Sequence, residues 1–274
     1  MTGATSGIGK VTAITLATLG ANVTVFCRDM NKGNALREEF EKTKNEKQGL
    51  IHPVECDLSS FRSVKQACAE FRNNHKTLDV LINNAGIWNP NREISRDGIE
   101  ETFAVNFLAP YYISREMTGL LKHDKEARII FTASGLHQGT IHFDDIEFTT
   151  AYSGFNAYKQ SKLGIILFTR FLAGELKNTG ISVFSVHPGL VNTNLARNAG
   201  FIPRNVFKVM GLSPEKGAVT LIYAATAGNL SKFSGEYLYL KKVKETSPES
   251  YDMDTAKRLI ELAEEYLVRI SERE

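Results

Sequence analysis

The residues that most directly suggest a reaction are Tyr158 and Lys162, in the run Tyr158-Lys159-Gln160-Ser161-Lys162. Residues four positions apart leave the same face of a helix, so the phenol and the ammonium are neighbours in this predicted helical stretch. A phenol normally titrates near about 10, and an adjacent ammonium favours its phenolate, which lets the tyrosine exchange a proton with a substrate oxygen. A packed tyrosine beside a surface lysine has the same spacing, and the pair alone favours that structural interpretation.

A glycine-rich segment opens the chain, Thr2-Gly3-Ala4-Thr5-Ser6-Gly7-Ile8-Gly9, and leads into a helical pattern that Gly20 closes. The first turn of a helix presents free N–H groups and a partial positive charge, and glycines let a pyrophosphate approach the backbone. The segment therefore predicts a dinucleotide site, although an ordinary glycine-rich turn has the same composition.

The end of the next predicted strand, Cys27-Arg28, indicates which dinucleotide binds. A site for NAD typically carries a carboxylate at this point, whereas a 2′-phosphate favours a guanidinium. Arg28 therefore predicts NADP(H), with a solvated surface arginine as the alternative. Asp29 comes one position later, where it is better suited to cap a helix that begins near Asn31.

Short apolar runs alternate with longer segments of helical period. Strands are predicted at 23–27, 50–54, 80–83, 128–132, 181–186 and 237–240, and helices at 8–20, 31–46, 60–74, 98–121, 156–178, 214–227 and 254–270. This alternation predicts a single α/β domain over residues 1–274, with a doubly wound, Rossmann-type parallel sheet and helices on both faces. Such sheets bind ligands at the carboxyl ends of their strands, so the loops there should hold the chemistry.

Composition restricts the partners and the compartment. The 33 basic and 31 acidic residues give a formal net charge of +2 without a basic tract, which favours a small ligand over nucleic acid. Cys27, Cys56 and Cys68 lack metal-type spacing and fit structural thiols in a reducing compartment. Because no apolar run reaches the roughly 18 residues that span a bilayer and no signal peptide is recognisable, we expect the chain as it stands to be cytoplasmic.

Further motifs follow the predicted strands: Asn83-Asn84-Ala85-Gly86, then Ser134, then His187-Pro188-Gly189. With the opening glycines and the Tyr158/Lys162 pair, they resemble the short-chain dehydrogenase/reductase family, in the same order along essentially the whole chain. Within that family the segments 27–29, 57–59, 158–163 and 187–193 are most similar to the retinol dehydrogenase-like group. The resemblance implies an NADP(H)-dependent oxidoreductase that interconverts a carbonyl and an alcohol.

The resemblance also implies a role for each active-site residue. Tyr158 would be the general acid/base, and Ser134 would hydrogen-bond the substrate oxygen and the developing oxyanion. Lys162 would bind the nicotinamide ribose and keep Tyr158 acidic, and Asn106 would hold a proton-relay water near Lys162. Without the resemblance, backbone hydrogen bonding explains Asn106 as well. Strand alternation does not separate Thr132 from Ser134, and the family pattern favours Ser134.

The implied cofactor residues come from every loop at this edge of the sheet. Asp57 would meet the adenine, Asn83 and Gly86 would line the adenosine side, and Thr193 would contact the carboxamide. The full set is Gly3, Thr5, Ser6, Gly7, Ile8, Gly9, Arg28, Asp57, Leu58, Asn83, Ala85, Gly86, Tyr158, Lys162, Pro188, Gly189, Val191 and Thr193. No metal is expected at His137, His142, Asp144 and Asp145, because hydride transfer from a nicotinamide needs none when a tyrosine supplies the proton.

One part of the family pattern is missing from the sequence. The family's first strand precedes the Thr2-Gly3 loop and is central to the sheet, between the strands that end at Cys27 and Asn83, whereas this sequence starts at Met1. Burial of about five apolar residues contributes roughly 1.5–3 kcal/mol each, comparable with a domain's stability of about 5–15 kcal/mol. We therefore expect the natural chain to begin upstream. Some relatives carry an N-terminal membrane anchor there, so membrane association of a longer form stays open.

The segment 194–212 follows the Pro188-Gly189 loop, where the family builds a substrate lid. Its apolar content predicts a hydrophobic substrate such as retinal, another lipid aldehyde, a steroid or a xenobiotic ketone. Relatives often pair through the helices near 98–121 and 156–178, so a homodimer is the implied assembly. Two alternatives stay open: a non-catalytic NADP(H)-binding sensor or inactive truncated form, and a nucleotide-sugar epimerase or dehydratase, which the glycine spacing and the chain length disfavour.

Overall fold

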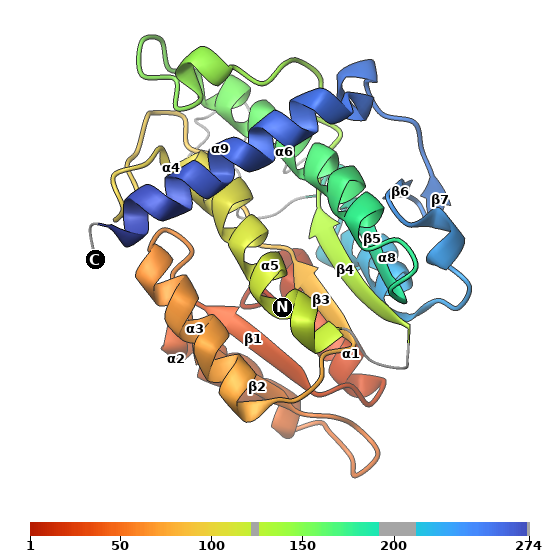
Figure 1. Ribbon diagram of the computed structural model, residues 1–274. Helices are drawn as coiled ribbons and strands as arrows, with labels where there is room; N and C mark the ends of the chain where they lie inside the picture. The colour runs from red at the N-terminus through yellow and green to blue at the C-terminus, as the bar shows by residue number, and fades with distance from the viewer. Residues whose placement is uncertain (122–125, 192–211, 273–274) are drawn as a thin grey trace.

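The computed structural model describes residues 1–121, 126–191 and 212–272. Strands and helices alternate through its first two thirds, as predicted (Figure 1). The elements in order are α1 Gly7–Thr18, β1 Val23–Cys27, α2 Met30–Glu41, β2 Ile51–Glu55, α3 Phe61–Asn74, β3 Val80–Asn83, α4 Glu101–Phe103, α5 Ala109–Leu121, β4 Ala127–Thr132, α6 Gly154–Glu175, β5 Ile181–His187, α8 Pro214–Thr226, β6 Tyr237–Tyr239, β7 Lys242–Val243 and α9 Met253–Ser271. Thr193 and nearly all of the predicted lid lie outside the described residues.

The strands form two ladders that Met1 and Thr2 connect. One ladder is the parallel pair β1-β2, and the other has the order β3-β4-β5-β6-β7, parallel except for β7. The Thr2 N–H donates to the Ile82 carbonyl at 3.0 Å, and the Phe26 N–H donates to the Met1 carbonyl at 2.9 Å. The first two residues thus lie between β1 and β3, the neighbours predicted for the family's first strand.

Helices cover both faces of the sheet, and each face has its own apolar core. Buried side chains of α3, α5, α6 and α9 pack on one face, and those of α1, α2 and α8 pack on the other. This arrangement confirms the predicted doubly wound, single-domain α/β fold. Among the helices of the described residues, none combines the length and the apolarity that crossing a bilayer requires.

The predicted helix at 98–121 is interrupted. A π-helical turn, η1 Ala104–Leu108, separates α4 from α5. Pro110 lacks the N–H that would bind the Asn106 carbonyl in an α-helix, which favours the wider turn. The turn carries Asn106, and wide turns of this kind frequently lie at functional sites. The edge strand β7 was not predicted, because two residues show no periodicity.

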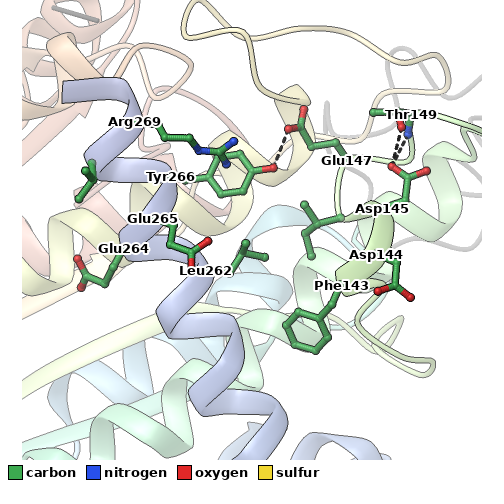
Figure 2. Close-up of a pocket in the computed structure, with 12 residues that line it drawn as sticks. Phe143, Asp144, Asp145, Glu147, Thr149, Leu262, Glu264, Glu265, Tyr266 and Arg269 are labelled. Atoms are coloured by element: carbon green, nitrogen blue, oxygen red, sulfur yellow. Dashed lines mark hydrogen bonds between the residues drawn. The ribbon is translucent and has the colours of Figure 1, made fainter. Parts of the chain in front are cut away.

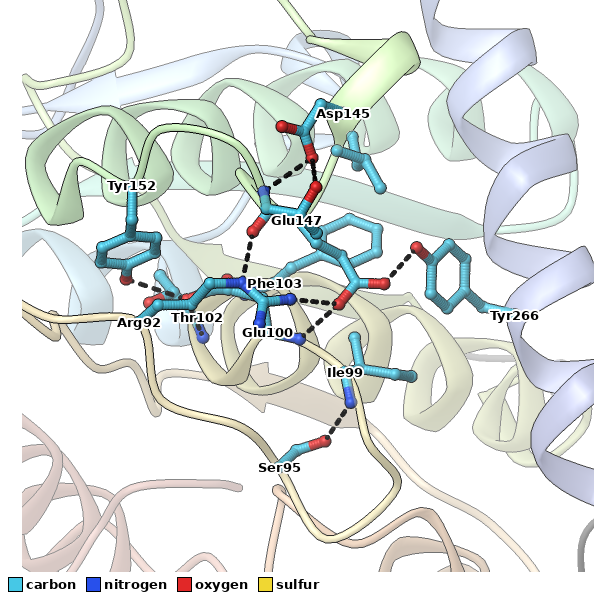
Figure 3. Close-up of polar contacts among 12 residues, drawn as sticks. Arg92, Ser95, Ile99, Glu100, Thr102, Phe103, Asp145, Glu147, Tyr152 and Tyr266 are labelled. Atoms are coloured by element: carbon cyan, nitrogen blue, oxygen red, sulfur yellow. Dashed lines mark hydrogen bonds and ion pairs between the residues drawn. The ribbon is translucent and has the colours of Figure 1, made fainter.

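Helix α9 packs across α6, and one carboxylate joins it to two loops (Figure 1). The Tyr266 hydroxyl of α9 donates to Glu147 Oε1 at 2.7 Å (Figure 3). The other Glu147 oxygen accepts from Arg92 at 3.1 Å and from the Glu100 N–H at 2.9 Å. Glu147 therefore holds the segment between β4 and α6 against both the loop after β3 and the C-terminal helix.

Candidate active site

A cleft of about 610 Å³ opens at the carboxyl ends of strands β1 to β5. Nearly all of the predicted catalytic and cofactor residues that the structure describes line it. These are Gly3, Thr5, Ser6, Gly7, Ile8, Gly9, Arg28, Asp57, Leu58, Ala85, Gly86, Ser134, Tyr158, Lys162, Pro188, Gly189 and Val191. The segments that the sequence analysis considered separately therefore meet in one cavity, with the glycine loop at one end and Tyr158 at the other.

At the glycine end, the wall of the cleft is backbone. Gly3 has φ +66°, and a Cβ there would lie 2.7 Å from Ala85 Cα. A Cβ on Gly9 would lie 2.0 Å from the Gly3 carbonyl oxygen and 2.6 Å from Asn84 Nδ2. These contacts leave no room for side chains and bring the first turn of α1, with its unpaired N–H groups, to the cavity wall. This cradle fits a pyrophosphate.

Three charged residues follow the strands β1 and β2 at this end. The Arg28 side chain is exposed at the rim, and within the described residues no hydrogen bond or ion pair engages it. Asp29 caps α2, because its Oδ1 accepts the N–H groups of Asn31 at 3.1 Å and Lys32 at 3.2 Å, as predicted. Asp57 is buried and accepts the N–H and the hydroxyl of Ser59 at 3.1 and 2.8 Å.

Asn83 does not line the cleft, contrary to the prediction. Its buried amide donates to Ser114 Oγ at 3.0 Å, and its Oδ1 has no partner among the described residues. Asn84 lines the cleft instead, donating to the Gly3 carbonyl at 3.0 Å and accepting from Thr132 Oγ1 at 3.2 Å. Successive side chains of an extended segment point to opposite sides, so only one of two adjacent asparagines can face the cavity.

Ser134, Tyr158 and Lys162 lie together at the other end. The Tyr158 hydroxyl lies beside the Ser134 side chain, and Ser134 Oγ accepts the Leu136 N–H at 3.0 Å. Lys162 Nζ donates to the Thr132 carbonyl at 2.9 Å and lies 5.6 Å from the centre of the Tyr158 ring. The end of β4 and one face of α6 thus bring two hydroxyls and an amine into one buried group.

Burial dominates the titration of this group. It raises the pKa of Tyr158 to about 12, against a smaller lowering by the Ser134 hydrogen bond. Burial also lowers the pKa of Lys162 to about 8. The spacing of the pair predicted a lowered pKa for the phenol, whereas desolvation of the phenolate prevails here. At neutral pH the phenol is therefore protonated, and the amine titrates close to the working range.

Asn106 lies beside this group and holds the backbone of the loop after β3. Its Oδ1 accepts the Ile87 N–H at 2.8 Å, and its Nδ2 donates to the Ile87 carbonyl at 2.9 Å and to Ser161 Oγ at 3.0 Å. A Cβ on Gly86 would meet Lys162 Nζ at 3.3 Å and Asn106 Oδ1 at 3.4 Å. Asn106 thus approaches Lys162 across Gly86, and the relay water stays a prediction.

Sequence reasoning missed Trp88, the chain's one tryptophan, which lines the cleft at the catalytic end. Its indole stacks on the Tyr158 ring with centroids 5.2 Å apart and an interplanar angle of 17°, and Phe155 lies 6.0 Å away. Asn106 binds Ile87 on one side of Trp88, and the Tyr152 hydroxyl donates to the Asn89 carbonyl on the other at 3.2 Å. The sequence offered one signal for Trp88 as a cleft residue, which is its position two residues after Gly86, just beyond the end of a predicted strand.

A second groove, of about 830 Å³, lies between α9 and the segment 143–149 (Figure 2). Carboxylates dominate its rim, among them Asp144, Asp145 and Glu265. Asp145 accepts hydrogen bonds from the backbone and hydroxyl of Thr149 at 2.7 and 2.9 Å. The described residues around this groove include none from the predicted catalytic and cofactor sets, so the chemistry is assigned to the cleft.

Comparison with known proteins identifies the family of the chain. The profile of the short chain dehydrogenase family matches residues 1–200. Retinol dehydrogenase 14 of Mus musculus is 36% identical over 279 residues, which cover 96% of this chain and 84% of that protein.

Two solved structures share the fold. An uncharacterised protein from Mycobacterium paratuberculosis has a TM-score of 0.77 at 29% identity, covering 97% of this chain and 91% of that one. A protein from Beutenbergia cavernae, assigned as an NAD(P)-dependent gluconate 5-dehydrogenase and solved with bound NADP at low occupancy, has a TM-score of 0.70 at 26% identity, covering 86% and 92%. The chain therefore belongs to the short-chain dehydrogenase/reductase family of oxidoreductases, within its retinol dehydrogenase group.

Proposed function

We propose that this oxidoreductase is NADP(H)-dependent and interconverts a carbonyl and an alcohol on an apolar substrate, with Tyr158 as proton donor and acceptor. The convergence of Ser134, Tyr158 and Lys162 at one end of the cleft carries the proposal, because the glycine loop lies at the other end of the same cavity. A bound NADPH supplies a hydride to the carbonyl carbon, and this chain's own groups manage the proton.

Tyr158 donates that proton in the direction of reduction. Because burial raises its pKa to about 12, the phenol is protonated at neutral pH and can act as a general acid. Ser134 Oγ accepts the Leu136 N–H, and the Ser134 hydroxyl would donate its proton to the substrate oxygen instead of to Tyr158. Lys162, whose pKa is lowered to about 8, binds the ribose and returns a proton to Tyr158.

Arg28 selects NADP(H) over NAD(H). Its exposed guanidinium, at the end of β1, lines the cleft and would pair with the 2′-phosphate. Asp29, the carboxylate nearest in sequence, is engaged as the cap of α2 and so does not serve as the ribose acceptor of an NAD site. The NADP bound to the Beutenbergia cavernae protein supports the same preference.

The substrate is apolar. Ile87, Trp88, Leu136 and Leu190 line the cleft around the catalytic group, and an apolar wall favours an apolar ligand. Retinal, another lipid aldehyde, a steroid or a xenobiotic ketone fits this surface, and the relatives named as retinol dehydrogenases support the first two classes.

The test is to measure NADPH oxidation, as the loss of NADPH absorbance, with a panel of apolar aldehydes and ketones. Tyr158→Phe should lower kcat by about 100- to 10,000-fold, because a positioned general acid contributes that much. Tyr223→Phe, on a partly exposed tyrosine of α8, is the matched control. Full turnover by Tyr158→Phe would contradict the proposed role, and NADPH binding by the wild type without turnover of any carbonyl would favour a sensor.

A further inference from the structure

The backbone carbonyl of Ser134 accepts two side-chain hydrogen bonds. Sheet pairing of β4 stops just before it, where the Ala133 N–H donates to the Val186 carbonyl at 2.8 Å. Beyond that point the Ser134 carbonyl accepts the Tyr237 hydroxyl at 2.9 Å and is 2.9 Å from His137 Nδ1. Side chains from β6 and from the turn 134–137 therefore replace a strand as partners of the residue that carries the catalytic hydroxyl.

The second nitrogen of His137 defines its protonation. Nε2 lies 3.2 Å from the backbone nitrogen of Ser247, whose N–H can only donate. Nε2 must therefore be the acceptor and carry no proton. The proton of the neutral ring is then on Nδ1, which donates to the Ser134 carbonyl. Both hydrogen bonds form in one tautomer of the neutral imidazole and in no other state of the ring.

The surroundings of His137 favour that neutral ring. Burial lowers its pKa most, and Arg170 and Lys244 lower it further, against the hydrogen bond to the Ser134 carbonyl and the charge of Glu249, which raise it. The ring also packs beside Tyr237, at 5.5 Å between centroids. His187 also stacks on Tyr237, and burial lowers its pKa to about 4, so it stays neutral above pH 5.

We propose that His137 and Tyr237 form a clamp on the Ser134 carbonyl that positions the Ser134 hydroxyl, and that protonation of His137 opens this clamp. His137 is thus a positioning residue that acts through Ser134, and its kinetic consequence rests on the proposed function. The Leu136 N–H already binds Ser134 Oγ, so the clamp restricts the main chain of the turn 134–137, which carries this hydroxyl. In the imidazolium, Nδ1 can still donate to the Ser134 carbonyl, but the N–H at Nε2 points at the N–H of Ser247. Repulsion between these two donors displaces the ring from the carbonyl, whereas the shorter amide of His137→Asn does not reach Ser247.

Substitutions of His137 separate its two nitrogens. The amide nitrogen of His137→Asn lies near the place of Nδ1 and keeps a donor for the Ser134 carbonyl, whereas His137→Phe fills the space without one. We expect His137→Phe to lower kcat about 10-fold, which corresponds to the loss of one hydrogen bond. His137→Asn should retain most of the wild-type kcat. The KM for NADPH should be unchanged in both variants. Equal kcat in the two variants would overturn the clamp.

The pH profile gives a readout that a purely structural histidine would not change. The neutral ring is the active form, so wild-type kcat should be full at pH 7 and fall as the pH is lowered toward 5. In His137→Asn, whose amide does not titrate, this decline should disappear. The same acid decline in both proteins would overturn the proposal.

A long-range proton–nitrogen NMR spectrum of protein with labelled histidine tests the clamp without any substrate. The His137→Asn spectrum identifies the signals of His137, which should report a protonated Nδ1 and an unprotonated Nε2 at pH 7. A proton on Nε2 would overturn the clamp even if turnover is normal. The expected tautomer in a protein that reduces no carbonyl would contradict the proposed function instead.

Discussion

The two ends of the cleft are built in different ways. At the nucleotide end the wall is main chain, and Gly3 and Gly9 matter because a Cβ would collide with the backbone behind them. At the catalytic end, buried side chains from distant parts of the chain hold the main chain, as in the Asn106 bonds to Ile87 and the Tyr237 bond to Ser134. The nucleotide end therefore depends on the absence of side chains, whereas the catalytic end depends on side chains that the whole fold brings together.

The largest effect on NADPH binding should come from Gly9→Ala, which removes the backbone cradle. The added Cβ would lie 2.0 Å from the Gly3 carbonyl, so the loop must shift. Overpacking of this kind costs about 1–3 kcal/mol, and we expect NADPH affinity to fall up to about 100-fold by calorimetry.

The chain offers matched controls for that substitution. Gly119 and Gly174 lie in helices with no atom within 4 Å of an added Cβ. Gly119→Ala and Gly174→Ala should leave NADPH affinity unchanged and raise the free energy of unfolding by about 0.5–1 kcal/mol each. Unchanged NADPH affinity in Gly9→Ala would show that the nucleotide end is not a backbone cradle.

A smaller effect at the same end should follow Arg28→Gln. Loss of the charged hydrogen bonds to a 2′-phosphate should raise the Kd of NADPH about 10-fold and leave that of NADH almost unchanged. Arg37→Gln makes the same charge change on an exposed position of α2 and should change neither constant. Equal weakening of both dinucleotides by Arg28→Gln would contradict its role in selectivity.

The smallest effect should come from Trp88→Ala, at the catalytic end. Loss of the indole from the Tyr158 ring removes a stack worth about 0.5–1.5 kcal/mol, so kcat/KM for an apolar aldehyde should fall about 2- to 10-fold. Trp88→Phe keeps an aromatic ring and should lower kcat/KM less. The Kd of NADPH should stay constant in both. A change in NADPH affinity as large as the change in kcat/KM would contradict the assignment of Trp88 to the catalytic end alone.

Much of the fold followed from the sequence, because alternating strands and helices produce strong periodicity. The strands Val23–Cys27 and Val80–Asn83 have the predicted bounds, and Met1 and Thr2 lie between them as the family pattern requires. The end of α2 at Glu41 is earlier than predicted, since helix ends carry weaker signals than helix interiors.

The site was harder to predict from the sequence than the fold. Local motifs brought the cofactor and catalytic residues to one cleft, but they did not distinguish Asn83 from Asn84, whose directions depend on the twist of one loop. The partners of Trp88 and His137 come from segments far away in sequence, which no local pattern records.

The place of α9 was not predicted either. The amphipathic helix was expected, but its contacts were not: Leu259 reaches Gly164 of α6, and Glu264 accepts from Tyr111 of α5. These contacts cover part of α5 and α6, the helices considered for the homodimer. The homodimer stays a prediction.

Transfer of deuterium from NADPH tests the central claim most directly. Reduction of an apolar aldehyde with NADPH deuterated at the transferring position of the nicotinamide, followed by mass spectrometry of the alcohol, reports the path of the hydride. We predict one deuterium on the carbinol carbon, and none at that carbon when unlabelled NADPH is used in heavy water. An alcohol that takes this hydrogen from the solvent, or no alcohol at all, would contradict the account.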